Sequence, residues 1–262
     1  MSKMPKIIQG KYKIIFNKKA GPGYYKMAIS APEIARGACP GEFVHLRCGS
    51  GLEPLLRRPF SFHRLNEANF EILYKVIGRG TNLLAKKKKG DIINVLGPLG
   101  NGFEIKTEEA ILVGGGMGVA PLLALGERLA GRKNTIVLIG ARNKKEVLCE
   151  SEFKRLGARV QITTDDGSRG HKGFLTNLLS KILQRTNKQT SKRIMIYACG
   201  PKPMLKEITR LGRKFNLAAY GSLEENMACG VGACLGCVVG TREGYKRVCK
   251  DGPVFNLREI KW

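Results

Sequence analysis

Two patterns of hydrophobic and polar positions follow one another along the chain, and the change falls close to residue 104. In the first part, half-alternating runs of β-forming residues are separated by turns rich in glycine and proline, which indicates antiparallel strands. In the second part, apolar runs alternate with segments of helical periodicity, which indicates a parallel sheet wrapped by helices. We therefore expect a β domain followed by an α/β domain.

The same patterns predict the individual elements. In the first part we expect strands at residues 12–16, 42–46 and 70–76, which together suggest a small antiparallel β-barrel. In the second part we expect strands at residues 110–113, 135–140, 159–162 and 193–197, and helices at residues 119–130, 145–156, 174–184 and 203–215. The expected domains are a barrel at 1–104, a Rossmann-like α/β domain at 105–220 and a C-terminal segment at 221–262.

The C-terminal segment carries a candidate metal centre. Its four cysteines are spaced Cys229-x4-Cys234-x2-Cys237-x11-Cys249, which is the plant-type spacing for a [2Fe-2S] cluster. The small residues between them allow a loop to wrap closely and to point backbone N–H groups at sulfur atoms. A zinc site, which usually shows two C-x2-C pairs, and ordinary buried or disulfide-paired cysteines are the alternatives.

Length and composition fit a soluble protein of about two domains. The 262 residues include 43% hydrophobic residues, enough for each domain to bury a core. No apolar run approaches the roughly 18 residues of a membrane span, and the first residues lack the apolar region of a signal peptide. We expect a cytoplasmic location, where the other four cysteines remain thiols.

The chain is strongly basic. Lys and Arg outnumber Asp and Glu by 46 to 21, which gives a net charge of +25. The excess is spread along the sequence, with one run at residues 86–89, and no nucleic-acid-binding motif accompanies it. We interpret the charge as a solvated basic surface, with docking of an acidic partner as the alternative.

Two segments have the chemistry of dinucleotide binding. Arg57 and Arg58 precede Pro59, Phe60 and Ser61, so that guanidinium groups suited to a pyrophosphate stand next to a hydroxyl that can bond a flavin edge. A basic strand edge at the surface is the alternative interpretation of this segment.

The second segment is a glycine-rich loop that joins a predicted strand to a predicted helix. Gly114, Gly115, Gly116 and Gly118 would place backbone amides and a helix N-terminus at a phosphate. The Rossmann fingerprint is imperfect, because Val119 stands where its last small residue belongs. A plain strand-to-helix turn is the alternative.

Cofactor choice depends on charged residues after the next strands. Asp165 and Asp166 would repel a 2′-phosphate and favour NAD over NADP, whereas Arg142 and Lys144 argue for the reverse.

These motifs resemble those of the ferredoxin–NADP reductase superfamily. Residues 58–61 match its R-x-[YF]-[ST] flavin motif, the loop at 114–121 matches its glycine signature, and Cys199-Gly200-Pro201 matches its C-G-P element beside the nicotinamide. The order of barrel, nucleotide domain and cysteine segment resembles, over nearly the whole chain, the electron-transfer subunits of NAD-dependent dihydroorotate dehydrogenases. This resemblance implies FAD, NAD and a [2Fe-2S] cluster as cofactors.

The resemblance also implies roles for individual residues. The expected FAD contacts are Arg58, Pro59, Phe60, Ser61, Leu73, Tyr74, Lys75, Gly80 and Thr81. The expected nucleotide contacts are Gly114, Gly115, Gly116, Gly118, Cys199, Gly200 and Pro201. The expected cluster ligands are Cys229, Cys234, Cys237 and Cys249, whereas Glu224 and Glu225 are interpreted mainly as solvated acids.

The implied function is an electron relay within an oxidoreductase of pyrimidine (UMP) biosynthesis. An FMN-containing catalytic subunit would oxidise dihydroorotate in a heterotetramer, and this chain would pass the electrons through the cluster and FAD to NAD+. We expect neither a nucleic-acid nor a membrane partner. The alternatives are the small subunit of a bifurcating NADH-dependent ferredoxin:NADP oxidoreductase or of a sulfhydrogenase, and an iron–sulfur scaffold without catalysis.

Overall fold

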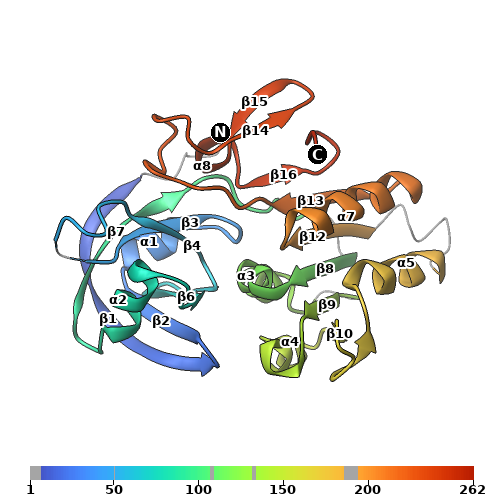
Figure 1. The fold of residues 1–262 in the computed structure, drawn as a ribbon, viewed down its shortest axis with the longest axis horizontal. Coiled ribbons are helices and arrows are strands. Elements are labelled where there is room, and N and C mark those ends of the chain that lie inside the picture. The colour runs from blue at the N-terminus through green and yellow to red at the C-terminus, as the bar shows by residue number, and fades with distance from the viewer. Residues whose placement is uncertain (1–6, 50, 107–108, 132–133, 186–193) are drawn as a thin grey trace.

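A computed structural model describes residues 7–49, 51–106, 109–131, 134–185 and 194–262, and the structural statements below concern these residues. The chain forms a barrel-like antiparallel sheet and a second, mostly parallel sheet, with the C-terminal segment lying across both (Figure 1). The described part of the chain contains no helix that is both long and apolar enough to cross a membrane.

The N-terminal domain is a seven-stranded antiparallel sheet with the order β4-β3-β7-β1-β2-β6-β5. Its strands are β1 (Ile8–Gly21), β2 (Tyr24–Ser30), β3 (Phe43–Arg47), β4 (Arg58–Ser61), β5 (Arg64–Leu65), β6 (Asn69–Lys75) and β7 (Ile92–Leu99), with helices α1 (Pro32–Gly37) and α2 (Arg79–Lys86). This confirms the predicted antiparallel β domain. The predicted strands 12–16, 42–46 and 70–76 overlap β1, β3 and β6.

Strand β3 is buried on both faces. Val44 and Leu46 point into the core of the barrel, together with residues such as Phe62 and Phe70. Because side chains alternate along a strand, Phe43 points to the opposite face. There it belongs to the core cluster that includes residues of the C-terminal segment and of the second domain. One strand of the barrel thus takes part in two cores.

The second domain is a seven-stranded sheet with the order β11-β10-β9-β8-β12-β13-β16, parallel except for β16. Its strands are β8 (Glu109–Gly115), β9 (Ile136–Ala141), β10 (Arg159–Thr164), β11 (His171–Lys172), β12 (Ile194–Cys199), β13 (Ala218–Ser222) and β16 (Val254–Asn256). Its helical elements are η1 (Gly116–Gly118), α3 (Val119–Leu129), η2 (Lys144–Glu146), α4 (Glu150–Arg155), α5 (Leu175–Arg185) and α7 (Lys202–Lys214).

Helices cover both faces of this sheet, as the alternating strand pattern predicts. Ala110 and Leu112 of β8 pack with α3 and α4, whereas Ile111 and Val113 pack with α5 and α7. The predicted α/β architecture is confirmed, and all four predicted strands overlap observed ones, although Arg193, the first residue of one of them, lies outside the described residues.

Two helical predictions differ from the structure. The helix expected at 145–156 begins only at Glu150, because the Asn143 side chain accepts a hydrogen bond from the Lys145 N–H and starts the separate turn η2. Cys149 then adopts a left-handed backbone conformation, with φ of 63°, directly before α4. Helices α1 and α2 were not predicted, because the pattern of the first part indicates only strands separated by turns rich in glycine and proline.

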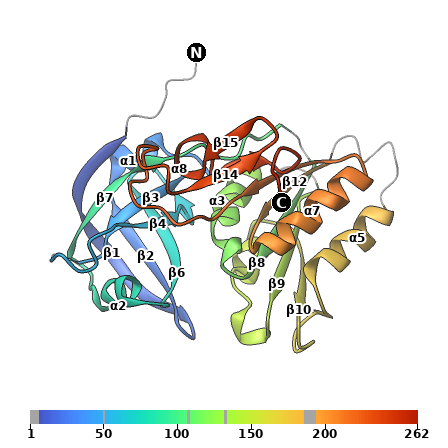
Figure 2. The ribbon, with the colours of Figure 1, turned by 45° about the horizontal axis from the view of Figure 1, so that its top comes forward.

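The C-terminal segment adds β14 (Val238–Thr241), β15 (Gly244–Arg247) and α8 (Val248–Asp251) before β16. Figure 2 shows it, in red, lying over the barrel and the second sheet. The Asn101 N–H, two residues after β7, donates to the Gly252 carbonyl at 2.6 Å, and β16 extends the second sheet beside β13. The segment therefore connects the two domains.

The buried faces of the second sheet predict a stability difference. Leu112→Ala, at a fully buried position, should lower the free energy of unfolding by about 2–5 kcal/mol because it leaves a cavity. Leu52→Ala, where the side chain is 79% exposed, should change it by no more than about 0.5 kcal/mol. Urea unfolding followed by circular dichroism at equal cofactor loading measures both, and equal effects would contradict this core assignment.

Candidate functional site

A cavity of about 750 Å³ opens between the barrel and the second domain. All nine residues that the sequence predicts for FAD line it, from β4 (residues 58–61), β6 (residues 73–75) and the start of α2. The opposite wall comes from η1 and α3 and from residues 222–227 of the C-terminal region. The structure therefore brings together the segments that the sequence could only propose separately.

The barrel side of this cavity is held by fixed polar contacts. The Tyr74 hydroxyl donates to Asn17 Oδ1 at 2.9 Å, and the Asn17 side-chain N–H donates to the Leu84 and Lys87 carbonyls. Arg58 donates to the Leu56 carbonyl at 2.9 Å. An aromatic ring and a guanidinium group therefore stand in one cavity with defined orientations, as a flavin and its pyrophosphate require.

The first turn of α2 faces the same cavity. Thr81 Oγ1 accepts the N–H groups of Ile77 and Gly78, at 3.0 and 3.2 Å, and donates to the Gly78 carbonyl. Its hydroxyl is therefore engaged within the turn. The backbone amides at this helix start, including that of Gly80, are the better candidates for binding a phosphate.

A second cavity, of about 580 Å³, adjoins the carboxyl ends of the parallel strands. Gly115, Gly116, Gly118, Gly200 and Pro201 line it. Two predicted contacts, Gly114 and Cys199, lie behind this surface, since neither belongs to the cavity wall. The carboxyl ends of parallel strands are where open α/β sheets bind nucleotides.

The two nucleotide loops touch through their backbones. A Cβ atom at Gly118 would lie 2.1 Å from the Cys199 carbonyl oxygen, and one at Gly114 would lie 2.9 Å from the Val119 Cα. Close packing thus explains why glycine stands at these positions, even though φ is ordinary there. Gly116, with φ of 55°, and Gly200, with φ of 155°, in addition have backbone conformations that favour glycine.

Cys199 is a buried thiol. It is 1% exposed, and burial, together with the neighbouring Glu224 carboxylate, raises its pKa well above the usual range. A thiol in this environment stays protonated and is a poor nucleophile. Cys199 is therefore suited to packing beside the second cavity and not to acting as a covalent nucleophile.

Three side chains, Lys75, Met117 and Glu224, line both cavities. Lys75 Nζ lies 3.6 Å from Glu146 and 4.9 Å from the centre of the Tyr24 ring. The Glu224 side chain is exposed, and partial desolvation at this junction raises the pKa of its carboxyl. Sequence reasoning missed Met117 and did not place the exposed Glu224 at this junction, because no local pattern indicates that residue 224 returns to the end of β8.

The acidic residues expected to select NAD have different positions. Asp165 lines the second cavity, together with Arg142. The Asp166 carboxylate instead accepts the Ser168 N–H at 2.9 Å and the Ser168 hydroxyl at 2.6 Å, which holds it in a turn and lowers its pKa. Asp165 is therefore the acid that a bound nucleotide would meet.

The four clustered cysteines approach one another as two pairs. The Cys234 thiol donates to Cys229, and the Cys249 thiol donates to Cys237. Burial opposes ionisation of Cys229, but the N–H groups of Val231, Cys234 and Ala233 and the Cys234 thiol lower its pKa to about 6. In contrast, burial and the Cys237 thiol raise the pKa of Cys249 to about 12.

The geometry of the cysteine loop suits sulfur ligands. Gly230, Gly232 and Leu235 have φ of 73°, 83° and 58°, which turns the chain tightly around the sulfur atoms. The N–H groups of Val231 and Gly236 point at cysteine sulfurs at 3.5 Å. Within the described ranges no three His, Cys, Asp or Glu side chains meet as a site for a single metal ion. Two thiol pairs fit a binuclear centre better than one ion.

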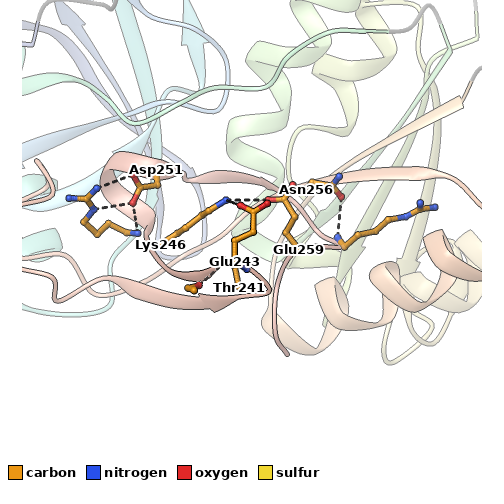
Figure 3. A network of polar contacts seen from close by, with 9 residues as sticks. Thr241, Glu243, Lys246, Asp251, Asn256 and Glu259 are labelled. Atoms are coloured by element: carbon orange, nitrogen blue, oxygen red, sulfur yellow. Dashed lines mark hydrogen bonds and ion pairs between the residues drawn. The ribbon is translucent and has the colours of Figure 1, made fainter.

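Polar contacts hold the hairpin that carries the last two cysteines (Figure 3). Lys246 Nζ lies 2.8 Å from Glu243 and 3.7 Å from Glu259, and Arg247 forms an ion pair with Asp251 at 2.9 Å. The Thr241 hydroxyl donates to the Gly244 carbonyl at 2.7 Å. Each such surface ion pair contributes roughly 0–1 kcal/mol to the free energy of unfolding. Together the pairs limit the conformations of the loop that presents Cys237 and Cys249.

Comparisons with known proteins match this arrangement. The profile of the iron–sulfur cluster binding domain of dihydroorotate dehydrogenase B matches residues 224–261, and that of the oxidoreductase NAD-binding domain matches residues 112–210. The dihydroorotate dehydrogenase B (NAD(+)) electron transfer subunit of Desulforamulus reducens is 40% identical over 268 aligned positions, covering 99% of this chain and 100% of that protein. The subunit of the same name from Fusobacterium nucleatum is 40% identical, covering 90% and 92%.

Solved structures share the fold. An NADH-dependent reduced ferredoxin–NADP oxidoreductase, studied for flavin-based electron bifurcation, is 32% identical with a TM-score of 0.85, covering 96% of this chain and 90% of that one. A ferredoxin NADP+ reductase from Neisseria gonorrhoeae, at 21% identity and a TM-score of 0.67, shows the fold alone. The chain belongs to the electron-transfer subunits of NAD+-dependent dihydroorotate dehydrogenase B, oxidoreductase subunits of pyrimidine biosynthesis with an NAD-binding and an iron–sulfur domain.

Proposed function

We propose that this chain binds FAD in the 750 Å³ cavity, NAD(H) in the 580 Å³ cavity and a [2Fe-2S] cluster at its four clustered cysteines. The observation that carries the proposal is that the two cavities share Lys75, Met117 and Glu224. Ligands in both cavities would therefore meet at this junction. A flavin supplies the exchange between single electrons from a cluster and a hydride for nicotinamide.

The protein's own residues would bind and orient the two dinucleotides. Arg58 and the amides at the start of α2 would hold the FAD pyrophosphate, and Ser61 and the backbone of residues 73–75 would hold the flavin ring. Gly115, Gly116 and Gly118 would let the backbone approach the pyrophosphate of NAD. Met117 at the junction would exclude water from the reacting edge.

The cysteine pairs match a two-iron centre. In a [2Fe-2S] cluster held by four thiolates, each iron takes two of them, and Cys229/Cys234 and Cys237/Cys249 are already paired in this way. The N–H groups that point at the sulfurs would stabilise the negative charge of the bound centre. One side of the segment is exposed, since Cys234 and Leu235 reach the surface.

A partner subunit follows from the family, whose members are named as one subunit of dihydroorotate dehydrogenase B. The proposed partner is an FMN-containing catalytic subunit, assembled with this chain in a cytoplasmic heterotetramer. Electrons would leave dihydroorotate on the partner and reach NAD+ on this chain.

A second candidate is the small subunit of an NADH-dependent ferredoxin:NADP oxidoreductase, because such a protein shares the fold at 32% identity. The two functions require different partners. Native co-purification should recover an FMN protein that oxidises dihydroorotate, whereas recovery of a large ferredoxin-reducing flavoprotein would favour the second candidate.

Loss of one cluster ligand should separate the cluster from the flavin. In Cys234→Ala, iron and acid-labile sulfide should be lost. Bound FAD should remain, and so should the NADH-dependent reduction of an artificial acceptor that takes electrons from the flavin. Cys39→Ala removes an exposed cysteine outside the segment and should keep the cluster. Iron, sulfide and flavin analysis of anaerobically purified protein checks this, and full iron content in Cys234→Ala would refute the ligand assignment.

The contact between the nucleotide loops predicts a selective loss of NADH binding. In Gly118→Ala the new methyl group would collide with the Cys199 carbonyl, so kcat/KM for NADH should fall about tenfold or more with FAD retained. Gly157→Ala, which strains a surface turn with φ of 77° but has no atom within 4 Å of the new Cβ, should keep wild-type kinetics. Steady-state kinetics with NADH and ferricyanide compare the two variants.

Cofactor preference should depend on Asp165. Because its carboxylate would repel a 2′-phosphate, Asp165→Asn should lower the NADH-to-NADPH ratio of kcat/KM by about three- to tenfold. Asp166→Asn is the matched control, since that carboxylate is engaged by Ser168. An unchanged ratio in Asp165→Asn would show that another group selects the nucleotide.

A further inference from the structure

A buried histidine lies beneath the cysteine loop. His45, on β3, has no exposed surface, and neither of its ring nitrogens has a hydrogen-bond partner among the described residues. A buried polar group without a partner costs about 1–3 kcal/mol. A histidine at this position therefore needs an explanation beyond packing.

The His45 ring contacts Gly230, which directly follows Cys229, the first of the four clustered cysteines. A Cβ atom at Gly230 would lie 2.7 Å from Nδ1 and 2.8 Å from Cε1 of His45, so this ring edge faces the Gly230 backbone. Phe43, on the same face of β3, packs edge-on against the imidazole with ring centres 5.8 Å apart. Phe43 also shares a core with Cys237 and Cys249. The imidazole is thus enclosed by the cysteine segment on the outer face of the barrel.

The charges that act on the ring from the described residues are positive. The backbone carbonyl of His45 accepts a hydrogen bond from the Arg57 guanidinium group. Burial of the imidazole, together with the positive charges of Arg57 and Arg58, lowers the pKa of His45 to about 4. In either protonation state an imidazole carries at least one N–H donor. The cysteine loop that packs on the ring at Gly230 would hold negatively charged sulfur, whose chemistry would satisfy such a donor.

We propose that His45 donates an imidazole N–H to a sulfur atom of the [2Fe-2S] centre and, as a positioning residue, raises the potential of that centre. This inference rests on the proposed function, because it requires the cluster. Reduction adds negative charge to the sulfurs, so a donor from the buried side stabilises the reduced state more than the oxidised state. The same imidazole supports the loop at Gly230, where a larger residue would displace it.

The test combines two substitutions of His45. His45→Leu keeps an apolar side chain of similar size and removes the donor, whereas His45→Gln keeps an N–H donor. In His45→Leu the equilibrium constant for one-electron reduction of the cluster should fall about tenfold, which corresponds to about 59 mV. His45→Gln should recover most of this shift. Redox titration monitored by electron paramagnetic resonance measures the potential at equal iron and sulfide content.

The matched control is His63→Leu. His63 is also fully buried in the barrel domain, and one of its ring nitrogens also has no partner among the described residues. It contacts the Ala120 carbonyl at 3.0 Å, on the side of the second domain. His63→Leu should leave the cluster potential unchanged, so a shift common to both leucine variants would identify a general effect of destabilising the barrel and overturn the proposal.

A spectroscopic measurement decides the contact itself, even if His45→Leu fails to fold. The chain has three histidines, so ¹⁵N-histidine labelling gives few candidate signals. Pulsed electron paramagnetic resonance of the reduced wild-type protein should show a histidine nitrogen coupled to the cluster, and His45→Gln should abolish that coupling. A loaded cluster without this coupling overturns the role of His45 alone, whereas protein without iron and sulfide overturns the proposed function as well.

Discussion

The packing of the C-terminal segment against both domains is the constraint on which the rest of the structure depends. The Asn101 side chain donates to the Lys250 carbonyl at 2.9 Å, and the Leu223 N–H donates to the Pro253 carbonyl at 2.9 Å. These bonds tie the end of the barrel and the end of β13 to the same few residues. Because buried backbone groups must be paired, the segment has little freedom to take another position. The cysteines are thereby held next to the wall of the larger cavity.

Electrostatic contacts between the domains complete this arrangement. Lys26, Arg64 and Lys75 of the barrel form ion pairs with Glu152, Glu127 and Glu146 of the second domain. In all three pairs the barrel supplies the cation and the α/β domain the carboxylate. Partly buried pairs of this kind favour one relative orientation even where their net contribution to stability is small. That orientation keeps the two cavities joined at Lys75.

The dual burial of β3 connects the barrel to the chemistry of the tail. Its inward side chains stabilise the barrel, and its outward side chains form the floor under the cysteine loop. Because both faces of this strand are covered, the four residues 43–46 are all buried without alternation, and Arg47 at its end is exposed. The polar group that does occur there, His45, is the exception that links the fold to the electron path.

The sequence alone determined the features that depend on short-range spacing. The intervals between Cys229, Cys234 and Cys237 limit which metal centre is possible, and the glycines at 114–118 limit how closely a phosphate can approach, because covalent geometry sets both. The continuous apolar run at residues 110–113, followed by a segment of helical periodicity, likewise predicted a buried strand in a sheet covered by helices. Only the tertiary structure placed Glu224 and Lys75 in one junction and His45 under Gly230. These partners are distant in sequence, and the packing of whole domains, which no local pattern encodes, decides whether they meet.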